Sequence, residues 1–195
     1  MFIRGKNNKF MIAMLAVGLT VVAGMSSLLA SYGTNIVPHA YWGAYVEITS
    51  KVKNNQSYTF NNTLAGTDPA SGHGKTTYIT DASGSITQQI GENQTTTINI
   101  PTGGHVLYGV LKEVTTTVQN TVAVVSGASL PQFQNLNVSN NGLGGDPVSG
   151  IGKHLIIFIK QTDGSITIMT IKEGISGTFQ CPNQAGLNGS NYSSY

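Results

Sequence analysis

Apolar side chains occupy every second position from residue 36 to residue 48, which is typical of an extended strand with one buried flank. The apolar set is Ile36, Pro38, Ala40, Trp42, Ala44, Val46 and Ile48. Pro38 has no backbone N–H to donate, so the first half of this strand suits a sheet edge or a strand-addition site better than a sheet centre. The pattern predicts a strand that completes a sheet, either in its own subunit or in another one.

Short apolar or alternating segments follow, separated by turns rich in Gly, Asn and Pro. Asp163-Gly164 between two apolar segments predicts a hairpin with a type I′ turn. Segment 155–159 is apolar on both faces, so it needs a cover on each side, and a second subunit is one candidate cover. We expect strands at 57–60, 76–80, 85–90, 95–100, 133–138, 155–159, 166–171 and 174–181, and two strands with a bend near Gln119-Asn120 within 106–125.

This series of strands, without an amphipathic helix after residue 30, predicts an all-β fold. We expect a single sandwich or jelly roll, with Ig-like or jelly-roll topology, after an N-terminal hydrophobic leader helix. Gly-Ser-Ile-Thr occurs at 84–87 and 164–167, and we interpret this short match as similar turn chemistry rather than as a repeat. The expected regions are a leader (1–30), a candidate donor strand (31–48), a β-sandwich body (49–181) and a polar tail (182–195).

Residues 1–30 have the layout of a secretory signal peptide. Three basic residues precede an uncharged segment at 10–30, and cleavage between Ala30 and Ser31 would follow a small side chain. The alternative is a retained membrane helix, because the uncharged segment is long enough to span a bilayer. We expect an extracellular or cell-surface protein that contacts a membrane only if the leader is retained.

The charge of the chain argues against a nucleic-acid partner. Charged residues make up 9% of the chain, and its formal net charge is +2. Removal of the leader takes away Arg4, Lys6 and Lys9, which leaves seven basic and eight acidic residues and a formal charge of −1. A basic surface for phosphates is therefore not expected. Cys181 is the single cysteine, so an internal disulfide is excluded, and a packed, inert thiol is favoured over a disulfide between subunits.

No pattern in the chain points to catalysis, a metal or a cofactor. Segment 69–76 is close to a phosphate-binding loop, but a strand is expected after it where that motif needs a helix. Trp42, with Tyr41 and Tyr45 beside it, could stack on a sugar, although packing in a core or interface is the favoured interpretation. The histidines lack a second ligand at metal-binding spacing; they are His39, His73, His105 and His154.

Asn-x-Ser/Thr acceptor sites for N-glycosylation lie in expected loops, strand margins and the tail. We expect glycans there if the source organism has the machinery. The candidate asparagines are Asn55, Asn61, Asn93, Asn137, Asn188 and Asn191.

The leader ending at Ala30, the alternating strand at 36–48 directly after it, and the β-rich, low-charge body up to Cys181 resemble the subunits of archaeal threads and bundling pili. Those are similar in principle to bacterial chaperone-usher pilins and biofilm-matrix fibre proteins. The resemblance rests on composition and layout. It implies a homopolymeric filament for adhesion or biofilm, built by donor-strand complementation, in which the strand at 36–48 completes the sheet of the next subunit.

Other functions remain open at this stage. A type IV pilin-like subunit would keep residues 10–30 as a helix in the filament core. A secreted carbohydrate-binding protein would expose its aromatic side chains to cell-surface glycans, and a membrane-anchored envelope or viral surface protein would retain the leader. A secreted hydrolase is the least favoured, because it would need histidine and carboxylate side chains to converge in one cleft.

Overall fold

The structure, a computed structural model, describes residues 36–123 and 131–181. Its strands are β1 (His39–Glu47), β2 (Ser57–Thr59), β3 (Thr76–Thr80), β4 (Ile86–Gly91), β5 (Thr95–Thr97), β6 (Val106–Glu113), β7 (Val122–Ala123), β8 (Gln132–Asn137), β9 (His154–Lys160), β10 (Ile166–Lys172) and β11 (Ser176–Gln180). Three short helices complete the set: η1 (Thr49–Lys51), α2 (Asn62–Ala65) and α3 (Thr115–Gln119). The fold is therefore an all-β sandwich, as the alternating pattern predicts.

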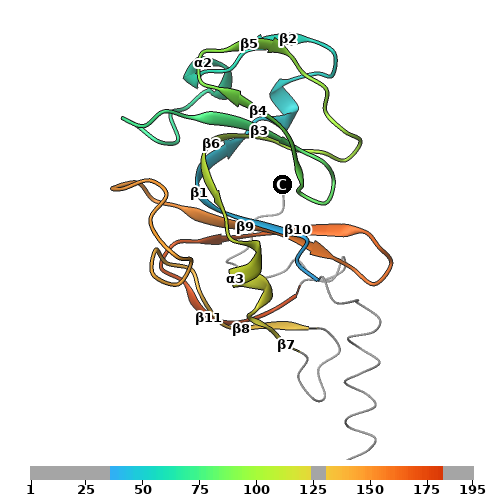
Figure 1. Cartoon of the computed structure of the whole chain (residues 1–195), viewed down its shortest axis with the longest axis vertical. Helices are drawn as coiled ribbons and strands as arrows, with labels where there is room; N and C mark the ends of the chain where they lie inside the picture. Colours follow the sequence, from blue (N-terminus) through green and yellow to red (C-terminus); the bar gives the residue numbers. More distant parts are fainter. Residues whose placement is uncertain (1–35, 124–130, 182–195) are drawn as a thin grey trace, which may run out of the picture.

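A six-stranded antiparallel sheet with the order β10-β9-β1-β6-β3-β4 runs through the middle of the molecule. Two small sheets cover its two ends, β2-β5 at one end and β11-β8-β7 at the other (Figure 1). Apolar side chains fill the space between the layers. One cluster packs β8 and β11 against β1, β9 and β10, and a second packs β2 and the segment after β5 against β3, β4 and β6.

The strand order of the central sheet is symmetric about its middle, because from either edge a hairpin is followed by one long strand. The hairpins are β10-β9 and β4-β3, and the long strands β1 and β6 pair with each other in the middle. We therefore divide the chain into repeat 1 (residues 36–101) and repeat 2 (residues 102–181). Within each repeat the elements follow in the same order, with β1 matching β6, β2 matching β8, β3-β4 matching β9-β10, and β5 matching β11.

The sequence carries the same duplication. Asp-Pro-x-Ser-Gly-x-Gly-Lys occurs at 68–75, before β3, and at 146–153, before β9. The shared Gly-Ser-Ile-Thr segments then follow at the same point of each hairpin, and both turns are closed by matching hydrogen bonds, Asp81 N to Ser85 O (2.9 Å) and Gln161 N to Ser165 O (2.8 Å). The interpretation of this tetrapeptide as isolated turn chemistry is therefore wrong, since it belongs to an internal repeat.

An approximate two-fold axis passes through the β1-β6 ladder between Ala44 and Val110. Gly43 pairs with Leu111, and its counterpart Gly109 pairs with Tyr45. A Cβ atom on Gly43 would lie 1.9 Å from the carbonyl oxygen of Val110, and one on Gly109 would lie 2.1 Å from the carbonyl oxygen of Ala44. Both positions require glycine because the two strands approach more closely there than any side chain allows.

Several expectations from the sequence need correction. The strand at 36–48 lies in the sheet centre, between β9 and β6, and Pro38 is compatible with this because β1 begins at the next residue. Residues 115–119 form helix α3 instead of continuing a strand, since its Val118 is buried in the core beside β1. Tertiary packing here overrides the β-propensity of the threonine run.

The hairpin around Asp163 is confirmed, but its type I′ turn is not. Gly164 has a φ of +84°, whereas Asp163 is not among the residues with positive φ. The loop is longer than two residues because β9 ends at residue 160 and β10 begins at residue 166. Both faces of segment 155–159 are buried within this chain, so a second subunit is not required as a cover.

Candidate functional site

Strand β1 belongs to repeat 1 by sequence but to repeat 2 by pairing. It lies between β9 and β6, and both of these strands belong to repeat 2. At its start, Lys160 N donates to Ile36 O (2.9 Å) and Val37 N donates to the side-chain oxygen of Gln119 (2.8 Å). The strands that pair with β1 both lie in repeat 2, so β1 completes the sheet of the other repeat.

Strand β6 is placed in the reciprocal way. It lies between β1 and β3, which are both strands of repeat 1. Val106 and Tyr108 of β6 are buried in the core of repeat 1, whereas Ala40 and Trp42 of β1 are buried in the core of repeat 2. We call β1 and β6 the exchanged strands, because each repeat places its first strand in the sheet of the other.

Two matching polar clasps hold the exchanged strands together at their ends. His105 Nδ1 lies 2.7 Å from Glu47 Oε1, and His39 Nδ1 lies 3.2 Å from Glu113 Oε1. A threonine two residues after each glutamate donates to it, with both distances 2.9 Å. Burial opposes ionisation of Glu47, but the hydrogen bonds from His105 and Thr49 outweigh it and lower the pKa of Glu47.

Each repeat also contains a buried lysine that carries two carboxylate partners. Lys75 Nζ lies 3.1 Å from Asp68 and 3.3 Å from Glu92, and its side chain is 5% exposed. The counterpart Lys153 Nζ lies 3.1 Å from Asp146 and 3.4 Å from Glu173, and its side chain is 3% exposed.

The two lysine centres have an electrostatic effect on their partners. Burial opposes ionisation of Asp146, but hydrogen bonds from Lys153 and Val148 lower the pKa of its carboxyl group, and the Lys75 hydrogen bond lowers that of Asp68. Lysines that are saturated in this way are not available for a phosphate. The segment 69–76 is thus a loop that leads into strand β3, which agrees with the interpretation of it as a near match only.

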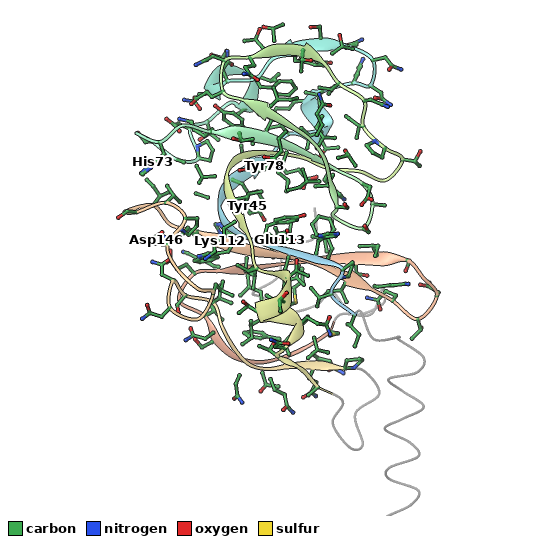
Figure 2. The ribbon with its side chains drawn as sticks, viewed as in Figure 1. Tyr45, His73, Tyr78, Lys112, Glu113 and Asp146 are labelled. Atoms are coloured by element: carbon green, nitrogen blue, oxygen red, sulfur yellow. The ribbon has the colours of Figure 1, made fainter. Side chains whose placement is uncertain are left out.

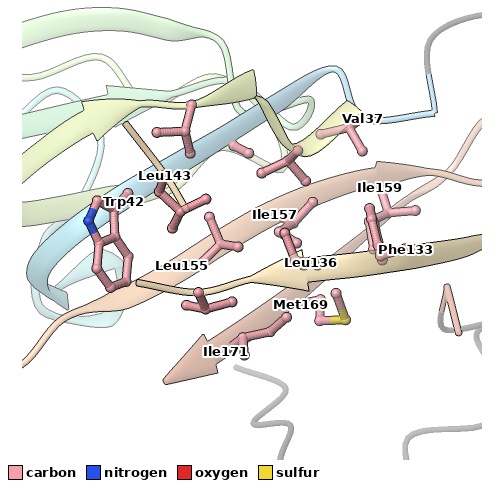
Figure 3. Close-up of a cluster of buried hydrophobic side chains, with 14 of the residues drawn as sticks. Val37, Trp42, Phe133, Leu136, Leu143, Leu155, Ile157, Ile159, Met169 and Ile171 are labelled. Atoms are coloured by element: carbon pink, nitrogen blue, oxygen red, sulfur yellow. The ribbon is translucent and has the colours of Figure 1, made fainter. Parts of the chain in front are cut away.

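The two lysine centres each face one large aromatic residue of an exchanged strand. The Tyr108 hydroxyl lies 3.0 Å from Asn62 Oδ1 and 2.9 Å from Glu92 Oε1 in repeat 1, and its single hydrogen is shared between these two acceptors. Trp42 occupies the matching position in repeat 2, with Lys153 Nζ 5.8 Å from its ring centroid, a cation–π arrangement. Figure 3 shows Trp42 beside Leu143 in this core.

Four of the seven residues predicted to form a donor strand lie in β1 and the other three lie directly before or after it, and the set divides among three clusters. Ile36, Ala40 and Trp42 pack in the repeat 2 core, Val46 and Ile48 pack in the repeat 1 core, and Ala44 lies between them on the two-fold axis. Pro38 is partly buried. Trp42 has no exposed surface, which agrees with core packing and excludes it as a sugar-stacking residue in this fold.

The expected modification sites are placed only in part. Asn55, Asn93 and Asn137 are exposed, while Asn61 is partly buried and its side-chain oxygen caps α2 by accepting from Leu64 N (3.0 Å). Glycosylation at these sites stays a prediction. Asn188 and Asn191, the cleavage site at Ala30 and Ser31, and the leader lie outside the described residues.

The described part of the chain has few other side chains that could bind a metal ion or titrate. No set of three or more His, Cys, Asp or Glu side chains converges there in a way that could hold a metal ion. His73 is exposed, and burial lowers the pKa of His154. Cys181 is buried, which raises the pKa of its thiol to about 12. None of the described helices has the length and apolar character needed to cross a bilayer.

Figure 2 labels Tyr45 in β1, Lys112 and Glu113 at the end of β6, and His73 and Asp146 on the two loops that precede the hairpins. Sequence reasoning missed the exchange of first strands, the two lysine centres and the two clasps. The eight-residue motif that occurs twice is the signal that could have found them.

Comparison with protein-family models, curated proteins and solved structures finds no match to this chain.

Proposed function

We propose that this protein is a structural subunit of an extracellular filament, assembled when β1 of one subunit enters repeat 2 of the next. The observation that carries the proposal is that β1 already acts as a donated strand, since all its backbone partners lie in the other repeat. The same contacts made between two chains would link subunits head to tail, and a contact that does not close on itself builds a filament.

The energetics support exchange between chains. Seven apolar side chains of residues 36–48 bury several hundred Å², worth roughly 10 kcal/mol at about 25 cal/mol per Å² before association costs. Because the same contacts form within one chain or between two, polymerisation is decided by the local protein concentration and by strain at the hinge. The hinge is the connection at 49–56, in which residues 53–56 are exposed.

The chain topology makes β1 the exchanged strand that can leave. Its only covalent link to the described fold is the connection at 49–56, whereas β6 is joined to folded elements at both ends. Extraction of β1 therefore needs no threading of the chain through a closed loop. Eight extended residues reach about 27 Å, which allows β1 to swing away from its own repeat 2.

A cysteine pair tests the proposal without removing β1 from the core. Ala44 and Val110 are register partners and pack in the same cluster, so cysteines there can form a disulfide between β1 and β6. In a Cys181→Ala background, assembly followed by oxidation should give a ladder of covalent oligomers on a non-reducing gel. Oxidation of monomers before assembly should prevent filaments in electron micrographs.

A second cysteine pair serves as the matched control. Lys160 and Ile166 are partners within one hairpin, so their cysteines can only join residues of the same chain. This variant should assemble and run as a monomer. A purified protein that stays monomeric at every concentration, or filaments whose Ala44–Val110 cysteine pair closes only within chains, would refute strand donation.

A further inference from the structure

In repeat 1, one amine and two carboxyl groups meet in a site that water barely reaches. Lys75 Nζ lies 3.1 Å from Asp68 Oδ1 and 3.3 Å from Glu92 Oε1, and its side chain is 5% exposed. The two carboxyl groups come from different parts of the chain, since Asp68 lies in the loop before β3 and Glu92 directly follows β4. The fold therefore holds a nucleophilic nitrogen against two different carboxyl groups.

The surroundings give these two carboxyl groups different roles. The Ala70 N–H donates to Asp68 Oδ1 (3.1 Å), so it can stabilise the negative charge that develops on this oxygen when the carboxyl carbon is attacked. Glu92 Oε2 accepts from the Lys75 backbone N–H (3.2 Å), and its Oε1 lies 2.9 Å from the Tyr108 hydroxyl. These contacts hold Glu92 beside the amine as a proton acceptor.

Repeat 2 has the same centre at the matching positions. Lys153 Nζ lies 3.1 Å from Asp146 Oδ1 and 3.4 Å from Glu173 Oε1. The Val148 N–H donates to Asp146 Oδ1 (3.0 Å), and the Lys153 backbone N–H donates to Glu173 Oε2 (3.2 Å). Both repeats therefore share the three charged side chains and the backbone donors that hold them.

A proline follows each of the two aspartates, Pro69 after Asp68 and Pro147 after Asp146. An activated aspartate is commonly attacked by the backbone nitrogen of the next residue, which gives a cyclic imide. Proline has no N–H for this side reaction. The motif thus keeps each aspartate carbon for the lysine nitrogen beside it.

We propose that each repeat closes an amide bond between its buried lysine and its aspartate, Lys75 with Asp68 and Lys153 with Asp146, and that the neighbouring glutamate carries the protons. The bond from Nζ to the aspartate Cγ forms, and one Cγ–O bond breaks. Of the three ammonium hydrogens, one stays on the amide nitrogen, and two pass through the glutamate to the departing oxygen and leave with it as water. No other reactant is consumed, and the glutamate ends as a carboxylate.

Burial favours the amide over the ion pair that precedes it. Burial opposes the charged form of Lys75, although its hydrogen bonds with the two carboxylates outweigh this and raise its pKa. The unreacted centre is therefore an ion pair, and its rare neutral form suffices for a bond that forms once in each chain. The amide removes two buried charges with their desolvation penalty, and the fixed geometry supplies an effective concentration on the order of 10⁵ M.

Each amide fixes a loop that covers the middle of the exchanged strands. Ala70 of one loop and Val148 of the other pack in one cluster with Ala44 of β1 and Val110 of β6. Lysine and aspartate are seven residues apart in both repeats, so each bond ties a loop to its own hairpin and does not join the repeats. This inference goes beyond the proposed function and does not depend on filament formation.

Tryptic mapping of the full chain tests the inference. The chain is produced in a bacterium without N-glycosylation machinery, incubated after folding, denatured and digested. Trypsin does not cleave after an acylated lysine, so peptides 54–75 and 76–112 should be replaced by one peptide, 54–112, that is one water lighter than its sequence. In repeat 2 the corresponding peptide is 113–160. Fragmentation should give no break within 68–75 or 146–153, because the ring holds both parts together.

Variants separate the roles of the residues, with each repeat as the control for the other. Glu92→Gln keeps the shape of the side chain but removes the proton acceptor, so the repeat 1 bond should form roughly a hundredfold more slowly. Glu173→Gln should have the reverse effect, and Asp68→Ala should restore complete cleavage after Lys75. A normal bond in the unchanged repeat shows that the variant chain has folded.

The native chain alone can refute the proposal. Complete cleavage after Lys75 and Lys153, with all peptides at full sequence mass after prolonged incubation, would overturn it and leave the ion pairs as the final state. A repeat 1 bond that forms at the native rate in Glu92→Gln would overturn the role of the glutamate. Strand donation is tested separately by the Ala44–Val110 cysteine pair, so the failure of one proposal is distinguishable from the failure of the other.

Discussion

Repeat 1 and repeat 2 share the features that join them and differ in their outer layers. Both have a glycine at the two-fold axis, a His–Glu–Thr clasp and a buried lysine with two carboxylates. The outer sheet of repeat 1 presents exposed Ser and Thr side chains, and three candidate glycosylation sites flank it. The outer sheet of repeat 2 has an additional strand, β7, and buries Phe133 and Leu136.

This comparison separates the residues that join the two repeats from the residues that form the outer surface of each repeat. The shared residues lie at the contact between the exchanged strands or in the buried ion pairs beside them, whereas the divergent residues lie in the two outer sheets. A face of hydroxyl groups suits contact with water or glycans, and a thicker apolar core suits the repeat that receives β1. Repeat 2 is accordingly the better candidate for the receiving half of a filament joint.

The largest effect is expected from the glycines on the axis. Gly43→Ala and Gly109→Ala each place a Cβ about 2 Å from a backbone carbonyl oxygen of the partner strand, so we expect both variants to lose most of their stability. Circular dichroism and urea unfolding measure this. Gly74→Ala and Gly152→Ala are matched controls with free space around the Cβ, and they should change stability little. Similar losses at all four positions would argue against the two-fold contact.

The buried lysines should come next. Lys153→Met and Lys75→Met each leave two carboxylates without their cation, and we expect each to cost about 3 kcal/mol of unfolding free energy, the lower end for buried pairs because the carboxylates are partly exposed. Lys160→Met, at an exposed position of β9, is the control and should be nearly neutral. A neutral Lys153→Met alongside a costly Lys75→Met would break the equivalence of the two centres.

A smaller effect on stability is expected when the pH is lowered. The pKa of Glu47 is lowered from 4.5 in the fold, so its contribution to stability is complete above that pH and is lost as the pH falls through the lower, folded value. Glu92 and Asp146 shift in the same direction. Urea midpoints should therefore decrease below about pH 4.5, and less steeply in Glu47→Gln. A midpoint that rises on acidification would contradict the clasps.

The smallest effect concerns Cys181, which has the position of Ile98 in repeat 1, since Cys181 N donates to Pro131 O as Ile98 N donates to Gln56 O. It replaces an apolar core residue. Its thiol, with a pKa raised to about 12 by burial, should not react with a thiol reagent at pH 8 until urea unfolds the chain. Rapid labelling of the native protein would show that the repeat 2 core opens readily.

The sequence predicts the fold class well because alternation along short strands is a local signal. It also predicts the apolar residues of β1 and the two hairpins. It does not predict the position of β1 in the sheet, because pairing with β9 and β6 joins residues that are sixty or more positions apart. Helix α3 is not predicted for the same reason, since the burial of Val118 in the tertiary fold favours a helix over a strand there.

Only part of the candidate site could be predicted from the sequence. The apolar set of β1 can be read from the pattern, but the lysine centres require comparison of the motif at 68–75 with the motif at 146–153. A tetrapeptide match alone indicates only a turn, because turns of one kind favour the same few residues. The histidines that form the clasps lie far in sequence from their glutamates, so no local spacing reveals them.

Electron cryo-microscopy of the assembled protein tests the exchange between subunits most directly, because it can follow the backbone from residue 48 to residue 58 across a subunit boundary. The account predicts filaments in which β1 lies between β9 and β6 of the neighbouring chain, with Trp42 in the core of the neighbour's repeat 2. Filaments in which every chain keeps β1 in its own sheet, or particles that are only monomers, would contradict it.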